Sequence, residues 1–224
     1  MNKITHTADG SNTLYNENIG EHYHSKHGAL QESKHVFIAA GLEHAVSLFP
    51  KQEISILEVG FGTGLNFLLS AAYCSWHQVR LKYTSLEAFP LRHEELESTG
   101  YNNYVPAEIW SGMIDNYGKA MQQDVNILPD QQLRIVHTYL HRYHTEQQFD
   151  VLYYDAFSVQ HQPEMWTEEI IAHACESIKP GGIFVTYAIT GNLKRALKNI
   201  GFSIEKLPGA PGKREMLRAI KLVS

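Results

Sequence analysis

The sequence predicts an α/β fold built on one mostly parallel sheet with helices on both faces. Strand-like runs alternate with longer segments whose apolar residues recur at helical spacing, which is typical of parallel strands joined by crossover helices. The run at residues 149–157 is mostly apolar, as expected for a central strand covered on both faces. Two strand-like runs near the end lie close enough to pair as an antiparallel hairpin, so we expect seven strands in all.

The individual elements follow from local composition and turn signals. Strands are predicted at residues 53–60, 81–89, 133–140, 149–157 and 180–189, followed by the hairpin strands at 202–209 and 214–223. Helices are predicted at residues 32–49, 65–76, 91–99, 108–122, 165–179 and 191–200. Gly41 is expected to interrupt the first helix, and the Pro-Gly-Gly at 180–182 marks the turn into the fifth strand.

The first 35 residues differ from the rest of the chain. They are polar, with short aromatic alternations such as TLYNENIGEHYHS, which predicts a small hairpin region rather than a helix. The 224 residues suffice for one domain with a core and a small appendage. We therefore predict an N-terminal cap, residues 1–35, packed on a main domain, residues 36–224.

Composition narrows the class of protein. The net charge of −5 shows no overall basic character, although a local basic patch would still suit a nucleic acid. Neither a signal sequence nor a membrane-spanning apolar run is evident, so we expect a cytoplasmic protein. Cys74 and Cys175 lie far apart in apolar contexts, which favours two buried thiols over a disulfide.

Three glycines at alternate positions, Gly60, Gly62 and Gly64, follow the first predicted strand in the stretch ILEVGFGTGLNF. Glycine tolerates positive φ and lets another group approach the main chain, and ligands of such sheets bind at the carboxyl ends of the strands. A dinucleotide fingerprint would need glycine where Leu65 stands, and no Gly-Lys-Ser/Thr phosphate loop follows. An uncharged adenosine-bearing ligand such as S-adenosylmethionine fits better, while a tight turn without a ligand stays open.

Three acidic residues are predicted at three strand ends. Glu58 ends the first strand and is expected to face the cationic end or the amino group of the ligand. Glu87 ends the second strand about 20 residues past the glycines, where the ribose-binding acid of this sheet type lies. Asp155 ends the apolar strand, where a buried acid is costly unless it has a partner. With the glycines and Asn66, these acids form the candidate cofactor site.

Several segments together resemble a known family. EVGFGTGLNF, SLEAFPL, DAFSVQHQPEMW, KPGG and GKREM occur in order over nearly the whole chain, and the match is weakest from about 100 to 133. In this combination they resemble the methyltransferase domain of MnmC. The resemblance implies a Rossmann-like class I fold that uses S-adenosylmethionine, with the antiparallel hairpin at one sheet edge and the small cap at the N-terminus.

The resemblance also implies an activity. It is methyl transfer from S-adenosylmethionine to the exocyclic amine of 5-aminomethyl(-2-thio)uridine at the wobble position of tRNA, giving the 5-methylaminomethyl form. The bifunctional enzyme carries a flavin oxidase domain as well. Because this chain ends at Ser224, it is expected to be the stand-alone methyltransferase form.

The same comparison assigns roles near the fourth strand. Asp155 would hold the acceptor amine by a hydrogen bond and orient its lone pair, so it is the candidate catalytic residue. The uridine must leave its stack, and Phe157, Met165 and Trp166 would form a stacking wall for it. The alternative for Met165 and Trp166 is that they anchor the following helix in the core. Tyr23 and Ser25 would touch the cofactor if the cap folds over it.

The basic loop and the third strand end complete the candidate set. Lys213 and Arg214 match the KREM motif and are expected to contact tRNA phosphates. At the end of the third strand the family often has Gly-Asp near the adenine, whereas this chain has His137 and Thr138. The Thr138 hydroxyl or a backbone amide would then contact the adenine. Ala156 replaces a family glycine and would narrow the substrate pocket.

Other functions remain as alternatives. A methyltransferase for a small amine, or an aminopropyltransferase, shares the fold and the acidic strand ends. A cofactor-binding scaffold without catalysis would be expected to have lost Glu58, Glu87 or Asp155, and a nicotinamide-dependent oxidoreductase is disfavoured by Leu65. The histidine-rich stretches HYHSKH and HTYLHRYH lack a completing cysteine or acid at recognisable spacing, so no metal site is expected.

Overall fold

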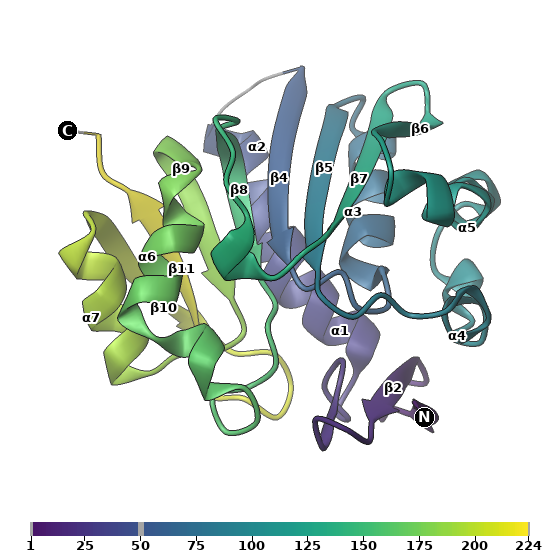
Figure 1. Ribbon diagram of the computed structural model, residues 1–224, viewed down its shortest axis with the longest axis horizontal. Helices are drawn as coiled ribbons and strands as arrows, with labels where there is room; N and C mark the ends of the chain where they lie inside the picture. The colour runs from purple at the N-terminus through teal and green to yellow at the C-terminus, as the bar shows by residue number, and fades with distance from the viewer. Residues whose placement is uncertain (1, 49–51, 224) are drawn as a thin grey trace.

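The computed structural model describes residues 2–48 and 52–223, and its centre is a twisted eight-stranded sheet with the order β10-β11-β9-β8-β4-β5-β7-β6 (Figure 1). The strands are β4 (Glu53–Val59), β5 (Arg80–Glu87), β6 (Val125–Leu128), β7 (Gln131–His137), β8 (Phe149–Tyr154), β9 (Ile178–Thr186), β10 (Phe202–Pro208) and β11 (Glu215–Lys221). The middle five strands are parallel to one another, and β11 pairs antiparallel with β9 and with β10. The predicted terminal hairpin is therefore confirmed.

The sheet differs from the prediction by one strand. The additional strand, β6, pairs antiparallel with β7 at the far edge and contains a register shift between Asn126 and Leu128. Its four residues lie in the weakly patterned region of the sequence, too short for a periodic signal to separate them from a loop. The chain runs outward from β4 through β5 to β7 and then returns to β8 on the other side of β4. This reversal creates the crevice in which such sheets bind ligands.

Helices cover both faces of the sheet, as predicted. They are α1 (Ala29–Ser33), α2 (His44–Leu48), α3 (Leu65–Trp76), α4 (His93–Glu97), α5 (Ala107–Ala120), α6 (Glu168–Glu176) and α7 (Gly191–Asn199). In Figure 1, α6 and α7 lie together on one side of the sheet, while α2 and α3 lie on the other. No helix in the described ranges is long and apolar enough to cross a membrane.

The first predicted helix is longer and less interrupted than expected. Between α1 and α2 the chain continues as a π-helix, Lys34–Glu43, so Gly41 does not break it. A Cβ at Gly41 would lie 3.0 Å from the side chains of Tyr153 and Val185, which shows that the glycine permits close packing of this helix on the sheet. The predicted helix end at residue 49, and the outer limits of the predicted cap and domain, residues 1 and 224, lie outside the described residues.

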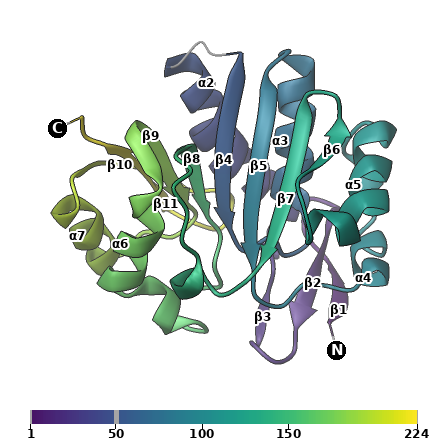
Figure 2. The same cartoon turned by 45° about the horizontal axis from the view of Figure 1, so that its top comes forward.

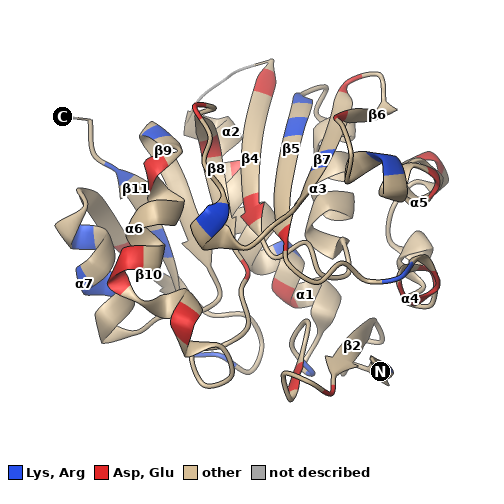
Figure 3. Ribbon diagram, in the orientation of Figure 1, with Lys and Arg blue, Asp and Glu red and all other residues tan. Residues whose placement is uncertain are grey.

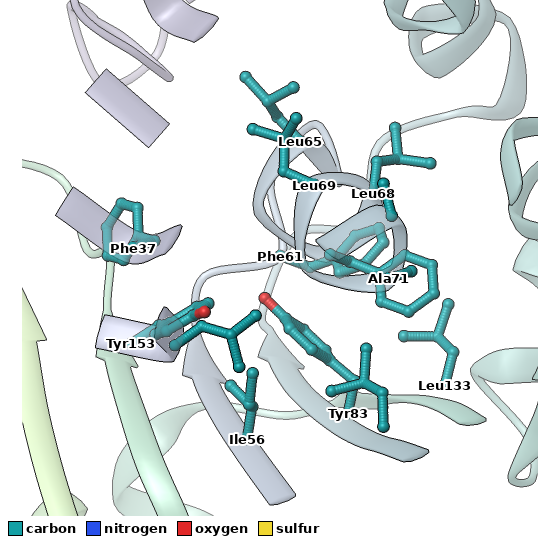
Figure 4. Packing of buried hydrophobic residues seen from close by; sticks show 14 of the residues in the cluster. Phe37, Ile56, Phe61, Leu65, Leu68, Leu69, Ala71, Tyr83, Leu133 and Tyr153 are labelled. Carbon is teal, nitrogen blue, oxygen red and sulfur yellow. The ribbon is translucent and has the colours of Figure 1, made fainter. Parts of the chain in front are cut away.

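The core has two halves, one on each face of the sheet. Along β8, Val151 and Tyr153 point toward α3, while Leu152 and Tyr154 point toward α6 and α7, as the two-residue period of a strand requires. Figure 4 shows Ile56, Tyr83 and Tyr153 on the face of the sheet that lies under α3, in the first half. Cys74 and Cys175 are buried in opposite halves and are free, which confirms the prediction of two buried thiols.

The N-terminal segment forms a small sheet of its own. Strands β1 (Lys3–His6), β2 (Asn12–Asn16) and β3 (Glu21–His22) pair antiparallel in the order β1-β2-β3. Figure 2 shows this sheet beside the carboxyl ends of β5 and β7. The helix that follows begins at Ala29, so the predicted boundary after residue 35 falls within a helical segment rather than in a linker.

Candidate functional site

A cavity of about 790 Å³ lies between the small N-terminal sheet and the carboxyl ends of the parallel strands. The first turn after β4, the loops after β5, β7 and β8, and the segment from β2 to residue 26 all contribute to its wall. Of the residues singled out in the sequence, the cavity wall contains Gly60, Gly62, Glu87, Thr138, Asp155, Ala156, Phe157, Met165 and Lys213, and also Tyr23 and Ser25. The cavity is therefore built where the strand order reverses, as the fold predicts.

The glycine turn is shaped by close approaches within the protein. Gly60, Gly62 and Gly64 have φ values of +93°, +51° and +76°, which side chains rarely adopt. A Cβ on Gly60 would lie 2.8 Å from the carbonyl oxygen of Asp155, and one on Gly62 would lie 2.9 Å from the Tyr23 ring. The turn is thus compressed between a neighbouring strand end and the N-terminal segment, with Gly60 and Gly62 facing the cavity.

Glu87 connects the second strand to the glycine turn. One carboxylate oxygen accepts a hydrogen bond from the backbone N–H of Gly62, and the other accepts one from that of Phe89, both at 2.8 Å. Burial raises the pKa of Glu87, and these two N–H groups oppose that rise. A carboxylate has about four acceptor positions, so the two hydrogen bonds leave acceptor capacity for ligand hydroxyls such as those of a ribose.

Asp155 lies at the cavity wall just beyond β8. Its Oδ2 accepts a hydrogen bond of 2.8 Å from Asn66 Nδ2 on α3. Burial is the largest cause that raises its pKa to about 8, and nearby Glu32 raises it further, while Asn66 and Lys213 lower it. Burial thus moves the pKa of Asp155 from the acidic range toward neutral pH, a kind of shift that is common at functional sites.

Glu58 does not face the cavity, contrary to the prediction. Its side chain is 0% exposed and points beneath the turn, where it accepts hydrogen bonds from Asn66 Nδ2 at 3.0 Å and Ser85 Oγ at 2.8 Å. The next residue of the strand, Val59, does line the cavity. Asn66 and Gly64 are likewise absent from the cavity wall, so they support the turn without reaching the ligand space.

The N-terminal segment is held over the cavity by polar contacts that the sequence did not reveal. His24 is buried and forms a 2.8 Å hydrogen bond with the hydroxyl of Thr63 in the glycine turn. The Glu21 carboxylate accepts a hydrogen bond of 2.8 Å from the backbone N–H of Ser158, in the loop after Asp155. These contacts join residues more than 35 positions apart, so only the alternating pattern around HYHS hinted at them.

Of the three residues predicted to form a stacking wall in the loop after Asp155, two line the cavity and one does not. Phe157 lines the cavity, with its ring 5.2 Å from that of Tyr23, and Met165 lines it as well. Trp166 is only 7% exposed, and its indole N–H donates a 2.7 Å hydrogen bond to the carbonyl of Phe157. Trp166 therefore packs in the core and lies outside the cavity wall, which agrees with the alternative interpretation for Trp166, whereas Met165 lines the cavity.

Lys213 and Arg214 occupy different environments. The Lys213 ammonium pairs with Glu32 at 2.7 Å and lies 3.6 Å from the centre of the Tyr187 ring, at the edge of the cavity. The Glu32 side chain is only 6% exposed, so this pair is largely internal. The Lys213 side chain is 34% exposed, so its predicted contact with a tRNA phosphate stays a prediction, with Glu32 as a competing partner. Arg214 is exposed and lies outside the cavity wall.

At the end of β7, Thr138 lines the cavity but His137 does not. His137 is exposed, and its Nε2 lies 3.2 Å from the carbonyl oxygen of Ala88. Of the two residues that the sequence offered for the cofactor at this strand end, only Thr138 therefore lines the ligand space. Beside Thr138, the exposed rings of Phe89 and Tyr139 meet edge to face at 5.8 Å. Across residues 2–48 and 52–223, no group of three or more His, Cys, Asp or Glu is arranged to hold a metal ion.

Comparison with known proteins agrees with this geometry. Residues 105–222 match the model of a family described as S-adenosyl-L-methionine-dependent methyltransferase. The chain is 31% identical over 205 residues to the bifunctional protein MnmC of tRNA 5-methylaminomethyl-2-thiouridine biosynthesis from Hydrogenovibrio crunogenus, covering 87% of this chain and 30% of that protein. It is 29% identical to the corresponding protein of Pseudoalteromonas atlantica, covering 97% of this chain and 33% of that one. The chain thus spans about a third of the length of these relatives.

Solved structures show the same fold. MNMC2 from Aquifex aeolicus superimposes with a TM-score of 0.75 at 24% identity, covering 100% of this chain and 71% of that one. A putative class I S-adenosylmethionine-dependent methyltransferase from Listeria monocytogenes gives a TM-score of 0.54 at 18% identity, covering 88% of this chain and 64% of that one. The cavity, the glycine turn and Glu87 fit the cofactor that the matched family uses, S-adenosylmethionine. The chain belongs to the S-adenosyl-L-methionine-dependent methyltransferase family.

Proposed function

We propose that this protein methylates the exocyclic amine of 5-aminomethyl(-2-thio)uridine at the wobble position of tRNA. The observation that carries the proposal is the Asp155 carboxyl group, which lies on the cofactor cavity and has a pKa of about 8. An alkylammonium has a pKa near about 10.4 and lacks the lone pair that attack on a methyl group requires. The site must therefore remove a proton from the acceptor, and Asp155 is placed to accept it.

In this proposal, some residues around the cavity bind the cofactor and others orient the acceptor amine. Glu87 and the backbone of Gly60 and Gly62 would hold the adenosine end of S-adenosylmethionine, which supplies an electrophilic methyl group on a sulfonium when bound. Asp155 accepts the ammonium proton and holds the resulting amine by a hydrogen bond, so that its lone pair is aligned with the methyl group. The rings of Phe157 and Tyr23 face the same space, where a flipped base would stack.

The tRNA substrate is supported by similarity rather than by geometry. The relatives with about 30% identity are named for biosynthesis of 5-methylaminomethyl-2-thiouridine in tRNA. The segment DAFSVQHQPEMW, which carries the family resemblance, contributes six residues to the cavity wall: Asp155, Ala156, Phe157, His161, Gln162 and Met165. We therefore place the modified uridine between Asp155 and Phe157.

The test is methyl transfer by the purified protein with labelled S-adenosylmethionine. The acceptors are tRNA that bears 5-aminomethyluridine, tRNA that bears unmodified uridine, and a panel of small primary amines. We expect label only in the first, recovered as 5-methylaminomethyl nucleoside by mass analysis. Label confined to the small amines would overturn the tRNA assignment and favour a small-amine methyltransferase.

The pH dependence tests the role of Asp155 separately. Because the raised pKa of Asp155 keeps it protonated below about 8, kcat/KM for the amine-bearing tRNA should rise with pH up to that value. In Asp155→Asn the rise should shift to higher pH, toward the pKa of the acceptor ammonium at about 10.4, and kcat at neutral pH should fall by about 10²-fold or more. Wild-type turnover by Asp155→Asn would contradict the proposed role.

A further inference from the structure

Asn66 is a buried polar residue whose position in the fold has no packing explanation. It lies in the first turn of α3, is 2% exposed and faces the sheet, where an apolar side chain would ordinarily pack. Its single –NH₂ group uses both hydrogens on carboxyl groups, donating to Glu58 Oε1 at 3.0 Å and to Asp155 Oδ2 at 2.8 Å. The two carboxyl groups come from the ends of neighbouring strands, so Asn66 joins them directly.

The arrangement leaves part of the amide unsatisfied. Asn66 Oδ1 is buried and accepts no hydrogen bond from the described part of the protein. The amide keeps this orientation because both neighbours at its nitrogen are carboxyl oxygens, which accept hydrogen bonds. A locally unfavourable group beside a candidate catalytic carboxylate is typical of a site under functional constraint.

Glu58 accepts a hydrogen bond from the Asn66 amide and is buried without a cationic partner among the described residues. It forms no ion pair with any Lys, Arg or His of the described chain, and its other oxygen accepts a hydrogen bond from Ser85 Oγ. Burial, followed by the nearby Asp155 carboxyl, raises the pKa of Glu58 well above its ordinary value. Because no cation of the described chain lies beside it, burial favours the neutral form of Glu58, so that a single negative charge is favoured next to Asn66 when Asp155 ionises.

We propose that Asn66 and Glu58 are positioning residues for methyl transfer, in which the Asn66 amide, anchored on a neutral Glu58, aims the Asp155 carboxylate into the cavity. This inference rests on the proposed role of Asp155 and deepens it. The Asn66 N–H bonds the charged form of Asp155 and so favours ionisation. Without the Asn66 N–H, the Asp155 carboxyl group would keep its proton to higher pH and would rotate freely in the cavity.

Other charges also face Asp155 and must be kept constant in any test. Glu32 and Glu21 on the N-terminal side raise its pKa, and Lys213 on the loop before β11 lowers it. Substitutions at Asn66 or Glu58 remove none of these groups. A change in the titration of Asp155 can then be assigned to the amide bridge.

The test uses full-length variants and two readouts, one of which needs no turnover. The first is the carboxyl ¹³C titration of Asp155, assigned by its loss in Asp155→Asn. The second is kcat, KM and the Kd of S-adenosylhomocysteine. Asn66→Ala is compared with Ser70→Ala, a control one turn further along α3, whose buried hydroxyl contacts Tyr153 and not the carboxyl pair.

We expect Asn66→Ala to raise the titration midpoint of Asp155 by about one pH unit and to lower kcat about tenfold or more, with the Kd of S-adenosylhomocysteine changed less than threefold. Glu58→Leu should reproduce the loss of kcat, and Glu58→Gln, an uncharged acceptor of the same shape, should restore most of it. Ser70→Ala should move neither the midpoint nor kcat.

Three outcomes would overturn the inference. One is an unchanged midpoint in Asn66→Ala, and another is a loss of kcat that Ser70→Ala shares. The third is a titration midpoint of Asp155 that falls by one pH unit or more in Glu58→Gln, because this result would show that Glu58 is an anion in the native protein. If amine-bearing tRNA is not methylated by the wild type, the proposed function fails, while the titration shift still decides the role of Asn66.

Discussion

His24 should make this protein less stable as the pH falls below about 6.5. The imidazole is 7% exposed and hydrogen-bonded to Thr63 in the glycine turn, so it joins the N-terminal segment to the cofactor site. Burial lowers its pKa from 6.5 to about 4; Glu32 opposes this shift and Lys213 adds to it. Because the folded protein keeps His24 neutral and the unfolded chain does not, the unfolded state binds more protons below pH 6.5.

The size of the effect follows from these two pKa values. Stability is intact above pH 6.5 and is lost as the pH falls toward 4. A shift from 6.5 to about 4 corresponds to a loss of about 2 kcal/mol at pH 5 relative to pH 8. Glutamine at this position keeps a group that can hydrogen-bond to Thr63 but does not titrate.

The assay is urea unfolding of the wild type and His24→Gln at pH 5, 6, 7 and 8, with hydrogen exchange of β1 to β3 to detect local opening. Other groups titrate in the same range, so the measured quantity is the difference between the two proteins at each pH. The stability of the wild type relative to the variant should fall by about 2 kcal/mol between pH 8 and pH 5. A difference that stays constant across this range would refute the reasoning.

Three further predictions concern the turn and the loops around the cavity. Gly60→Ala should destabilise the protein by about 1–3 kcal/mol in urea unfolding, because φ is +93° and the new Cβ would lie 2.8 Å from the carbonyl oxygen of Asp155. Gly191→Ala is the control and should be neutral or slightly stabilising, because no atom lies within 4 Å of its new Cβ. Equal effects of the two substitutions would contradict the proposed constraint. Glu87→Ala should raise the Kd of S-adenosylhomocysteine at least about tenfold by calorimetry, since it removes the acceptor of two backbone N–H groups, and an unchanged Kd would exclude it from the cofactor site. Arg214→Ala should reduce the slope of log K for tRNA binding against log salt concentration by about one. Lys213→Met should leave this slope unchanged, because the Lys213 ammonium is already paired with Glu32. The reverse result would show that Lys213 is the phosphate contact.

Sequence periodicity located most elements because strands and helices here have regular apolar patterns. The helix predicted at residues 65–76 is α3 with the same limits, and each predicted strand overlaps an observed one. The four-residue strand β6 was missed because it is too short to establish a period. Gly41 was misinterpreted because a glycine that permits close helix–sheet packing has the same local sequence as one that ends a helix.

The sequence by itself determined the fold class, the glycine turn and the three acids at strand ends, because these depend on spacing along the chain. It did not determine which acid faces the ligand. Successive side chains of a strand point to opposite faces of the sheet. Glu58 therefore points beneath the glycine turn, while its neighbour Val59 lines the cavity. The tertiary structure alone decided this, and it alone paired Lys213 with Glu32 across 181 positions, because such contacts depend on how distant segments pack and leave no local pattern.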